Sequence, residues 1–222
     1  MVSLSDIATT LNRWDTGKAF IIRGSDETFC SGSDLQVMKG LINEPAGGAM
    51  MAEFMHHTMT SLFQSRLLSL ALIEGHAVGG GSEIATACDF RLATSNGKIG
   101  FIHSRMGLIP GWGGASRLVR LVGRTQALKL LASAAVLDAQ TAVDMKLVDE
   151  IVSSVDPLQD AREWLMQFVH AEASVVHAIK RTVSTALETD LNDSLKNEAA
   201  IFVSLFGGKA QRNAMQRNVK HR

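Results

Sequence analysis

Gly79-Gly80-Gly81-Ser82-Glu83, with the segment Ile-Ala-Thr-Ala-Cys-Asp that follows it, is the stretch that decides the fold. A strand expected over 67–74 leads into these glycines, and a helix expected over 80–88 leaves them. A second turn of this kind, Phe29-Cys30-Ser31-Gly32-Ser33-Asp34-Leu35, follows a strand expected over 19–23. Glycine turns that open helices aim backbone N–H groups at one point. Two of them together predict an oxyanion hole, a pair of N–H groups that binds a negatively charged oxygen.

The rest of the chain repeats this order of strand, turn and helix, which predicts an α/β fold with parallel strands joined by helical crossovers. Further strands are expected over 90–94, 98–102 and 147–152. Helices are expected over 4–14, 34–41, 50–64, 115–122, 125–133 and 138–145. Beyond Pro157 only helices are expected, over 158–170, 174–187 and 191–206. We therefore predict an α/β core over residues 1–155 and a C-terminal helical region over 156–222.

The composition excludes several classes of protein. Hydrophobic residues make up 46% of the 222 residues, as in a globular domain, and 22 Lys and Arg balance 22 Asp and Glu. This balance predicts neither nucleic acid nor an acidic membrane as a partner. Two cysteines and a start, Met-Val-Ser-Leu-Ser-Asp, that lacks the features of a signal peptide predict a cytoplasmic protein. The apolar run over 67–73 is too short to span a bilayer.

Four ordered blocks resemble the crotonase, or enoyl-CoA hydratase/isomerase, superfamily. They lie at residues 28–35, 73–83, 87–91 and 106–118, and the resemblance extends from about residue 17 to residue 205. It implies a spiral of strand–strand–helix units, an acyl-CoA thioester as ligand, and a homotrimer or hexamer assembled through the C-terminal helices. Family members begin with a strand hairpin and a ligand-binding loop, whereas this chain starts at a helix, so the N-terminal strands are expected to be missing.

The resemblance also assigns site residues. The oxyanion-hole amides of the family fall on Ser33 and Gly80, and its first catalytic glutamate falls on Glu83. The second glutamate of the hydratases should lie seven residues before Pro110, where the chain has His103, and residues 97–110 contain no acid. Because adding water to an alkene needs a paired acid and base, this departure argues against hydration. The candidate catalytic residues are Ser33, Gly80, Glu83 and His103, and the candidate substrate-binding residues are Ser31, Gly32, Asp34, Leu35, Gly79 and Trp112.

Each assignment has a structural alternative. Small residues at 79–81 also allow a strand and a helix to pack closely, and a carboxylate in the first turn of a helix, such as Glu83, is stabilised by the helix dipole. A lone histidine such as His103 is more often an ordinary polar residue than a catalyst.

Within the superfamily the chain is similar to the decarboxylases that act on ethylmalonyl-CoA. Supporting details are the segments at 31–35, 87–92, 101–103, 110–114 and 206–208. Loss of CO2 beside a thioester carbonyl leaves an enolate, whose oxygen the amides of Ser33 and Gly80 would hold. No metal or other cofactor is expected, because the thioester itself accepts the electrons and coenzyme A is part of the substrate. The chain has no tyrosine, so Glu83, His103 or a held water must supply the proton.

Two other functions stay open at this point. One is an enoyl-CoA hydratase or isomerase that works with a single glutamate, Glu83. The other is a non-catalytic protein that binds CoA thioesters or takes part in an assembly.

Overall fold

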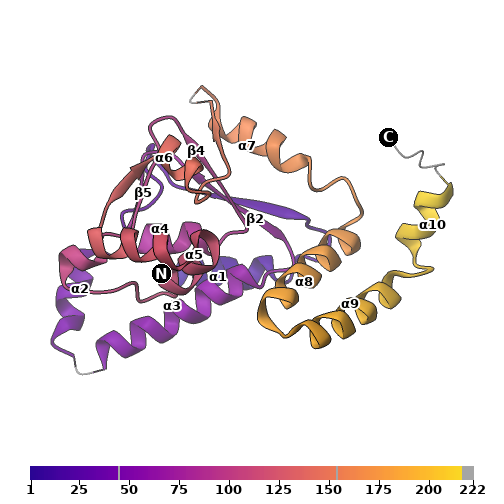
Figure 1. Ribbon diagram of the computed structural model, residues 1–222, viewed down its shortest axis with the longest axis horizontal. Helices are drawn as coiled ribbons and strands as arrows, with labels where there is room; N and C mark the ends of the chain where they lie inside the picture. The colour runs from indigo at the N-terminus through magenta and orange to yellow at the C-terminus, as the bar shows by residue number, and fades with distance from the viewer. Residues whose placement is uncertain (45, 154, 217–222) are drawn as a thin grey trace.

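The computed structural model of the protein describes residues 1–44, 46–153 and 155–216. Its helices and strands alternate through the first two thirds of the chain, and helices alone make up the last third (Figure 1). In chain order the elements are α1 (Val2–Leu11), β1 (Ala19–Arg23), α2 (Leu35–Ile42), α3 (Gly47–Phe63), β2 (Leu68–Ile73), β3 (His76–Val78), α4 (Gly80–Thr86), β4 (Phe90–Thr94), β5 (Lys98–Gly100), the 3-10 helix η1 (Ile102–Met106), α5 (Gly114–Ser133), β6 (Val136–Asp138), α6 (Ala139–Asp144), β7 (Glu150–Val152), α7 (Pro157–Met166), α8 (Ala173–Glu188), α9 (Leu191–Leu205) and α10 (Lys209–Gln216).

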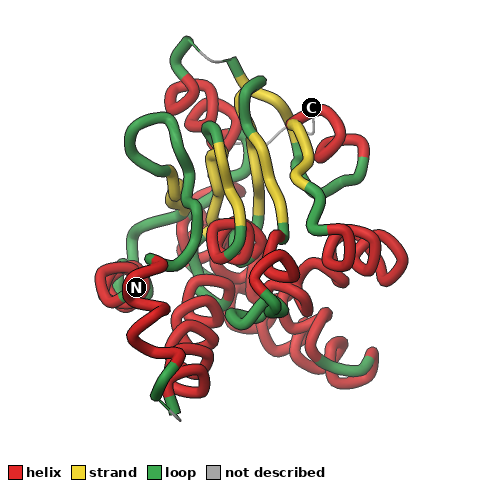
Figure 2. The backbone as a smooth tube through the Cα atoms, turned by 90° about the vertical axis from the view of Figure 1, so that its left-hand side faces the viewer, coloured by secondary structure: helices red, strands yellow, loops and turns green. Residues whose placement is uncertain are grey.

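The described strands form two sheets. The larger sheet has the order β1-β2-β4-β7, and each pair of neighbours is parallel. The smaller sheet has the order β3-β5-β6, in which β3 and β5 are parallel and β5 and β6 are antiparallel. Figure 2 shows the strands side by side, with most of the helices below them in that view. The predicted α/β fold with parallel strands is confirmed.

The central strand β2 carries the core on both of its faces. Leu70 and Leu72 pack against α7, whereas Ala71 and Ile73 face the core between the sheets and α4 and α5. All four side chains are at most 1% exposed. The sequence of a strand that is buried on both faces is a continuous run of apolar residues. The segment 67–74 has such a run and therefore predicts β2 well. Burial of each large side chain contributes roughly 1.5–3 kcal/mol to folding.

The strand register brings the two glycine turns together. Cys30 forms a parallel bridge with Ala77, in which Cys30 N donates to His76 O at 2.9 Å and Val78 N donates to Cys30 O at 3.0 Å. The segment before the first turn therefore runs beside β3, the strand before the second turn. Because carboxyl ends of parallel strands meet at one edge, both turns leave the sheet at the same place.

The C-terminal helices lie to one side of the sheet. Figure 1 shows α8 beside the strands, α9 running back along it, and α10 at the far end of this arm. The buried ammonium of Lys180 fixes α8 to the body, because it donates to Leu67 O and to Asp89 Oδ2, both at 2.7 Å. The predicted division of the chain after residue 155 stays a prediction, and residues 217–222 of the predicted helical region lie outside the described residues.

Several described elements differ from expectation. Strands β3 and β6 have three residues each, too few for a periodic pattern, and α10 was not expected beyond residue 206. The two helices expected over 115–133 form α5, with a non-helical backbone at Gly123 between them. Among the described residues, no helix combines the length and the apolar character needed to cross a membrane.

Candidate active site

The two glycine turns supply a pair of backbone N–H groups. Gly32 and Gly79 have φ values of 102° and 57°, in the left-handed region that favours glycine. A Cβ built on Gly32 would lie 3.0 Å from the nitrogen of Gly80, so the two turns are in contact. Gly80 is the first residue of α4, where an N–H has no partner within the helix. Within the described residues, neither Ser33 N–H nor Gly80 N–H donates to an acceptor.

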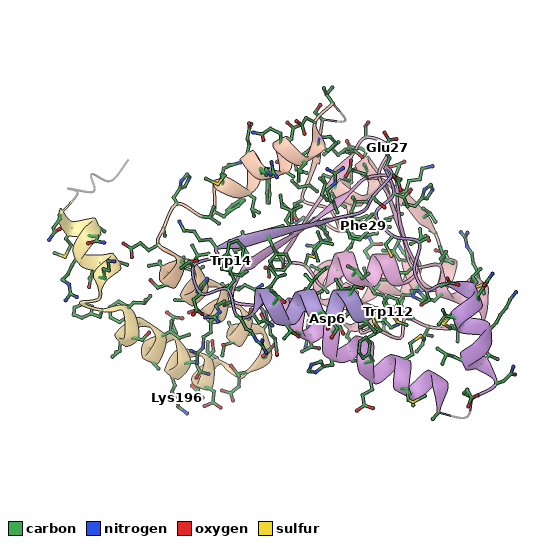
Figure 3. The ribbon with its side chains drawn as sticks, turned by 180° about the vertical axis from the view of Figure 1, so that it is seen from behind. Asp6, Trp14, Glu27, Phe29, Trp112 and Lys196 are labelled. Atoms are coloured by element: carbon green, nitrogen blue, oxygen red, sulfur yellow. The ribbon has the colours of Figure 1, made fainter. Side chains whose placement is uncertain are left out.

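The Trp112 ring lies against Gly80, the residue that carries the second of these groups. A Cβ built on Gly80 would lie 2.2 Å from Cζ3 of the Trp112 ring, so only glycine allows this contact. The ring is 4% exposed and packs in a cluster with Ala8 of α1 and Met55 and Met59 of α3 (Figure 3). The indole therefore closes one side of the Gly80 peptide with apolar surface.

Glu83 lies at the centre of the site, in the first turn of α4, and is 1% exposed. Its Oε2 accepts from Trp112 N and Gly114 N, each at 2.8 Å. Its Oε1 accepts from Gly111 N at 3.3 Å and lies 3.0 Å from His103 Nε2. These contacts tie α4 to the loop before α5 and to the N-terminus of α5, where the dipole favours a negative charge.

His103 lies in η1 and reaches the site through this contact with Glu83. Its side chain is 13% exposed. The other ring nitrogen, Nδ1, is buried and has no hydrogen-bond partner among the described residues. An unpaired buried polar atom is costly and rare in folded proteins, so this nitrogen calls for an explanation in the function of the site.

Arg117 is a further polar group near Glu83, and the sequence analysis did not single it out. Its Nη1 donates to Trp112 O at 2.8 Å and lies where a Cβ on Gly113 would be. Burial lowers the pKa of the Arg117 guanidinium, and the charge of Glu83 opposes this shift. Arg117 therefore contacts the same loop residue, Trp112, whose N–H is bound by Glu83.

The candidate substrate-binding residues fall into two groups. Gly32, Gly79 and Trp112 lie at the two N–H groups, as described above. The Asp34 carboxylate instead caps α2, because its Oδ1 accepts from Gln36 N at 2.7 Å. Ser31 and Leu35 are exposed beside this turn, Leu35 by 61%. Contact of these residues with a substrate stays a prediction.

The sequence analysis also missed the N–H groups of Gly111 and Gly114, which are donors to Glu83. Both residues lie in the glycine-rich segment at 110–114, which the resemblance included without a role. Backbone donors leave no signature in the residue type, so only the spacing of the glycines could have indicated them.

Comparison with known proteins assigns the family. The family model described as enoyl-CoA hydratase/isomerase matches residues 3–222. The chain belongs to the enoyl-CoA hydratase/isomerase family. Among relatives in this family, ethylmalonyl-CoA decarboxylase from Xenopus laevis is 41% identical over 224 aligned positions, which cover 100% of this chain and 75% of the relative. The corresponding protein from Gallus gallus is 44% identical over 223 positions, 99% of this chain and 74% of the relative.

Solved structures of the same family share the fold. The crystal structure of enoyl-CoA hydratase from Bacillus anthracis superposes with a TM-score of 0.91 at 28% identity, over 97% of this chain and 83% of that chain. The predicted superfamily and its spiral α/β architecture are thereby confirmed.

Proposed function

We propose that this protein decarboxylates a 2-alkylmalonyl-CoA thioester, with ethylmalonyl-CoA as the principal substrate and methylmalonyl-CoA as a second one. The observation that carries the proposal is the identity of 41–44% between almost the whole chain and relatives named ethylmalonyl-CoA decarboxylase. The site supports the same conclusion, because the two glycine turns that carry the proposed donors are in contact and the glutamate of a histidine–glutamate pair shares the helix α4 with Gly80.

In this reaction the bond between the α-carbon and the carboxylate breaks, and CO2 leaves. The electron pair stays on the α-carbon and is shared with the thioester carbonyl, which becomes an enolate oxygen. The N–H groups of Ser33 and Gly80 hold this oxygen as its charge grows. Loss of one such donor typically costs roughly 10²–10³ in rate. The thioester accepts the electrons, so the step itself requires no metal or further cofactor.

The enolate carbon then takes up one proton to give the saturated acyl-CoA. His103 is the best-supported donor, because its Nδ1 is the ring nitrogen that no described residue engages. The oxygens of Glu83 are already occupied by backbone N–H groups and by His103. For this transfer the His103 ring carries a hydrogen on each nitrogen; the Nδ1–H bond breaks, its electrons stay on Nδ1, and solvent later restores the proton.

Hydration of an enoyl-CoA is the alternative, because the solved relative from Bacillus anthracis is an enoyl-CoA hydratase. The contact between His103 and Glu83 argues against it, since a second carboxylate is absent at this position. A comparison of three substrates tests the proposal. Full-length protein is incubated with ethylmalonyl-CoA, methylmalonyl-CoA and crotonyl-CoA, while release of CO2 and loss of the enoyl double bond are followed.

We expect CO2 release from ethylmalonyl-CoA to exceed hydration of crotonyl-CoA by a wide margin. Faster hydration than decarboxylation would overturn the proposal in favour of the hydratase. Binding of all three thioesters without turnover would instead support a non-catalytic CoA-binding protein. Ser33→Ala is a suitable control, since it keeps the backbone N–H and should keep the activity.

We further propose that the protein acts as a homotrimer or hexamer in the cytosol. Leu195, Phe202 and Phe206 on and beyond α9 are 54–66% exposed, and apolar side chains gathered in this way usually meet a partner. Both cysteines are free thiols, which suits a reducing compartment. Sedimentation at micromolar concentration should give a particle mass of three or six times the 23.9 kDa of one chain, and the mass of a monomer would contradict the assembly.

A further inference from the structure

We infer that Glu83 is a positioning residue and not the proton carrier of the site. It fixes the tautomer and the orientation of His103, so that Nε2 carries the hydrogen toward Glu83 and Nδ1 faces the reaction. This inference rests on the proposed decarboxylation for its kinetic consequences, but its structural part concerns His103 and Glu83 alone.

The first support is that the acceptor capacity of Glu83 is fully used. A carboxylate offers about four lone-pair sites, and four groups surround this one at 2.8–3.3 Å. Three of these groups are backbone N–H donors of Gly111, Trp112 and Gly114, which cannot act as acceptors. With the side chain 1% exposed, no water replaces a contact that is lost.

The second support is the cost of a proton on Glu83. An acid that donates to a substrate must first hold a hydrogen on Oε1 or Oε2. On Oε2 this hydrogen would point at the N–H groups of Trp112 and Gly114. On Oε1 it would replace the hydrogen bond from Gly111 N or the one from His103 Nε2. Two donors facing each other in a buried site leave both unsatisfied, which is unfavourable. The surroundings therefore keep Glu83 as an acceptor.

The consequence falls on His103. Facing an oxygen that only accepts, Nε2 must carry the hydrogen, and the second nitrogen is the one left to gain and lose a proton. Nδ1 is also the buried atom without a partner in the described part of the chain. The same carboxylate holds the backbone of Trp112, whose ring covers Gly80. Glu83 thus holds both the histidine and the backbone of the residue whose ring packs on Gly80.

A direct test uses the ¹⁵N chemical shifts of the histidine rings, which distinguish the two neutral tautomers. His103→Gln assigns the His103 signals and keeps an N–H donor toward Glu83. In the unaltered protein we expect hydrogen on Nε2. In Glu83→Gln the amide oxygen stays with Trp112 N and Gly114 N, its NH2 group faces Nε2, and the hydrogen moves to Nδ1.

Glu74→Gln is the matched control, because Glu74 is another buried glutamate, 7% exposed, whose ion pair is with Arg23. This change should leave the His103 signals and the decarboxylation rate as they are. Thermal denaturation of each variant verifies that the chain is folded. The measurement on unaltered protein requires only the His103→Gln assignment, so it decides the orientation even if Glu83→Gln does not fold.

Kinetics supply the second readout. Glu83→Gln should lower kcat about tenfold or more with little change in KM, and His103→Gln should lower it by about 10²-fold or more. A positioning role requires that Glu83→Gln cost nothing further in the His103→Gln background. In that background, a loss from Glu83→Gln as large as its loss in the unaltered protein would show that Glu83 has its own proton role and would overturn the inference. A neutral His103 with its hydrogen on Nδ1 and none on Nε2 in the unaltered protein would overturn it as well.

The outcomes separate the two proposals. Absence of CO2 release by the unaltered protein would refute the proposed decarboxylation, while the tautomer of His103 would still decide the role of Glu83. If the protein releases CO2 but the neutral His103 carries its hydrogen on Nδ1, only the positioning role of Glu83 is refuted.

Discussion

Gly114→Ala should destabilise the protein through Glu83, whereas Gly111→Ala should not. Both glycines donate their N–H to the Glu83 carboxylate, and alanine keeps that N–H. A Cβ on Gly114 would lie 2.5 Å from Glu83 Cγ and 2.7 Å from Oε2, but a Cβ on Gly111 meets nothing within 4 Å. The pair of variants therefore differs in the space around the new methyl group and not in the hydrogen bond.

The size of the effect follows from these distances. Ordinary carbon contacts lie at about 3.5–4.0 Å, so Glu83 must retreat by about 1 Å. Its bonds of 2.8 Å to Trp112 N and Gly114 N would then exceed hydrogen-bond length. A hydrogen bond to a charged group contributes about 1.5–3 kcal/mol, and partial relaxation of the loop reduces the loss of two of them. We expect Gly114→Ala to lower the free energy of unfolding by about 3 kcal/mol.

Thermal denaturation measures this loss. At about 2–4 °C per kcal/mol for a chain of this size, Gly114→Ala should lower the Tm by about 6–12 °C. Gly111→Ala should stay within about 0.5 kcal/mol of the unaltered protein. Equal Tm values for the two variants would refute the reasoning, because the Glu83 carboxylate would then not be held as tightly as its contacts indicate.

Three further sites give predictions of their own. Gly80→Pro removes one proposed oxyanion donor and also places a Cβ against the Trp112 ring, so it should lower the decarboxylation kcat by at least about 10²–10³-fold. Ser33→Ala, which keeps its N–H, should change kcat little, and steady-state kinetics compare the two variants. Lys180→Met leaves the Asp89 carboxylate without its buried partner and should cost about 3–5 kcal/mol in urea denaturation, and a loss below 1 kcal/mol would contradict the ion pair. Burial raises the pKa of the Cys88 thiol from 9.0 to about 12. The unfolded chain therefore releases this proton first, and the free energy of unfolding should fall by about 1.4 kcal/mol per pH unit from about pH 9 to pH 12, a slope that Cys88→Ala should remove in denaturation series.

The fold could be predicted from the sequence wherever burial leaves a pattern. The apolar runs at 19–23 and 67–74 predict β1 and β2 closely, because both strands pack on two faces. The short strand β3 could not be predicted, since it has three residues and begins with the exposed His76. Its pairing with Cys30 is nevertheless what brings the two turns together. Short strands depend on their neighbours and carry little signal of their own.

The candidate site likewise has a part that the sequence predicts and a part that it does not. Ser33, Gly80, Glu83 and His103 could be named from turns and from a resemblance, and the structure brings Glu83 and His103 into contact. The donors around Glu83 could not be named, because they are backbone groups from the loop before α5. Residue types show which side chains can carry a charge. The backbone N–H groups that donate hydrogen bonds to such a charge can be identified only in the folded structure.

The contact between the Trp112 ring and the Gly80 peptide gives this protein an internal optical signal. Indole fluorescence responds to charge and water near the ring, and Trp112 is 4% exposed directly against the proposed oxyanion donor. The other two tryptophans are placed differently: Trp14 is 49% exposed, and Trp164 of α7 packs edge-on against Phe90 and at a tilt against Phe168. With both replaced by phenylalanine, the emission of Trp112 alone would report, in real time and without a label, the arrival of a thioester and the departure of its product.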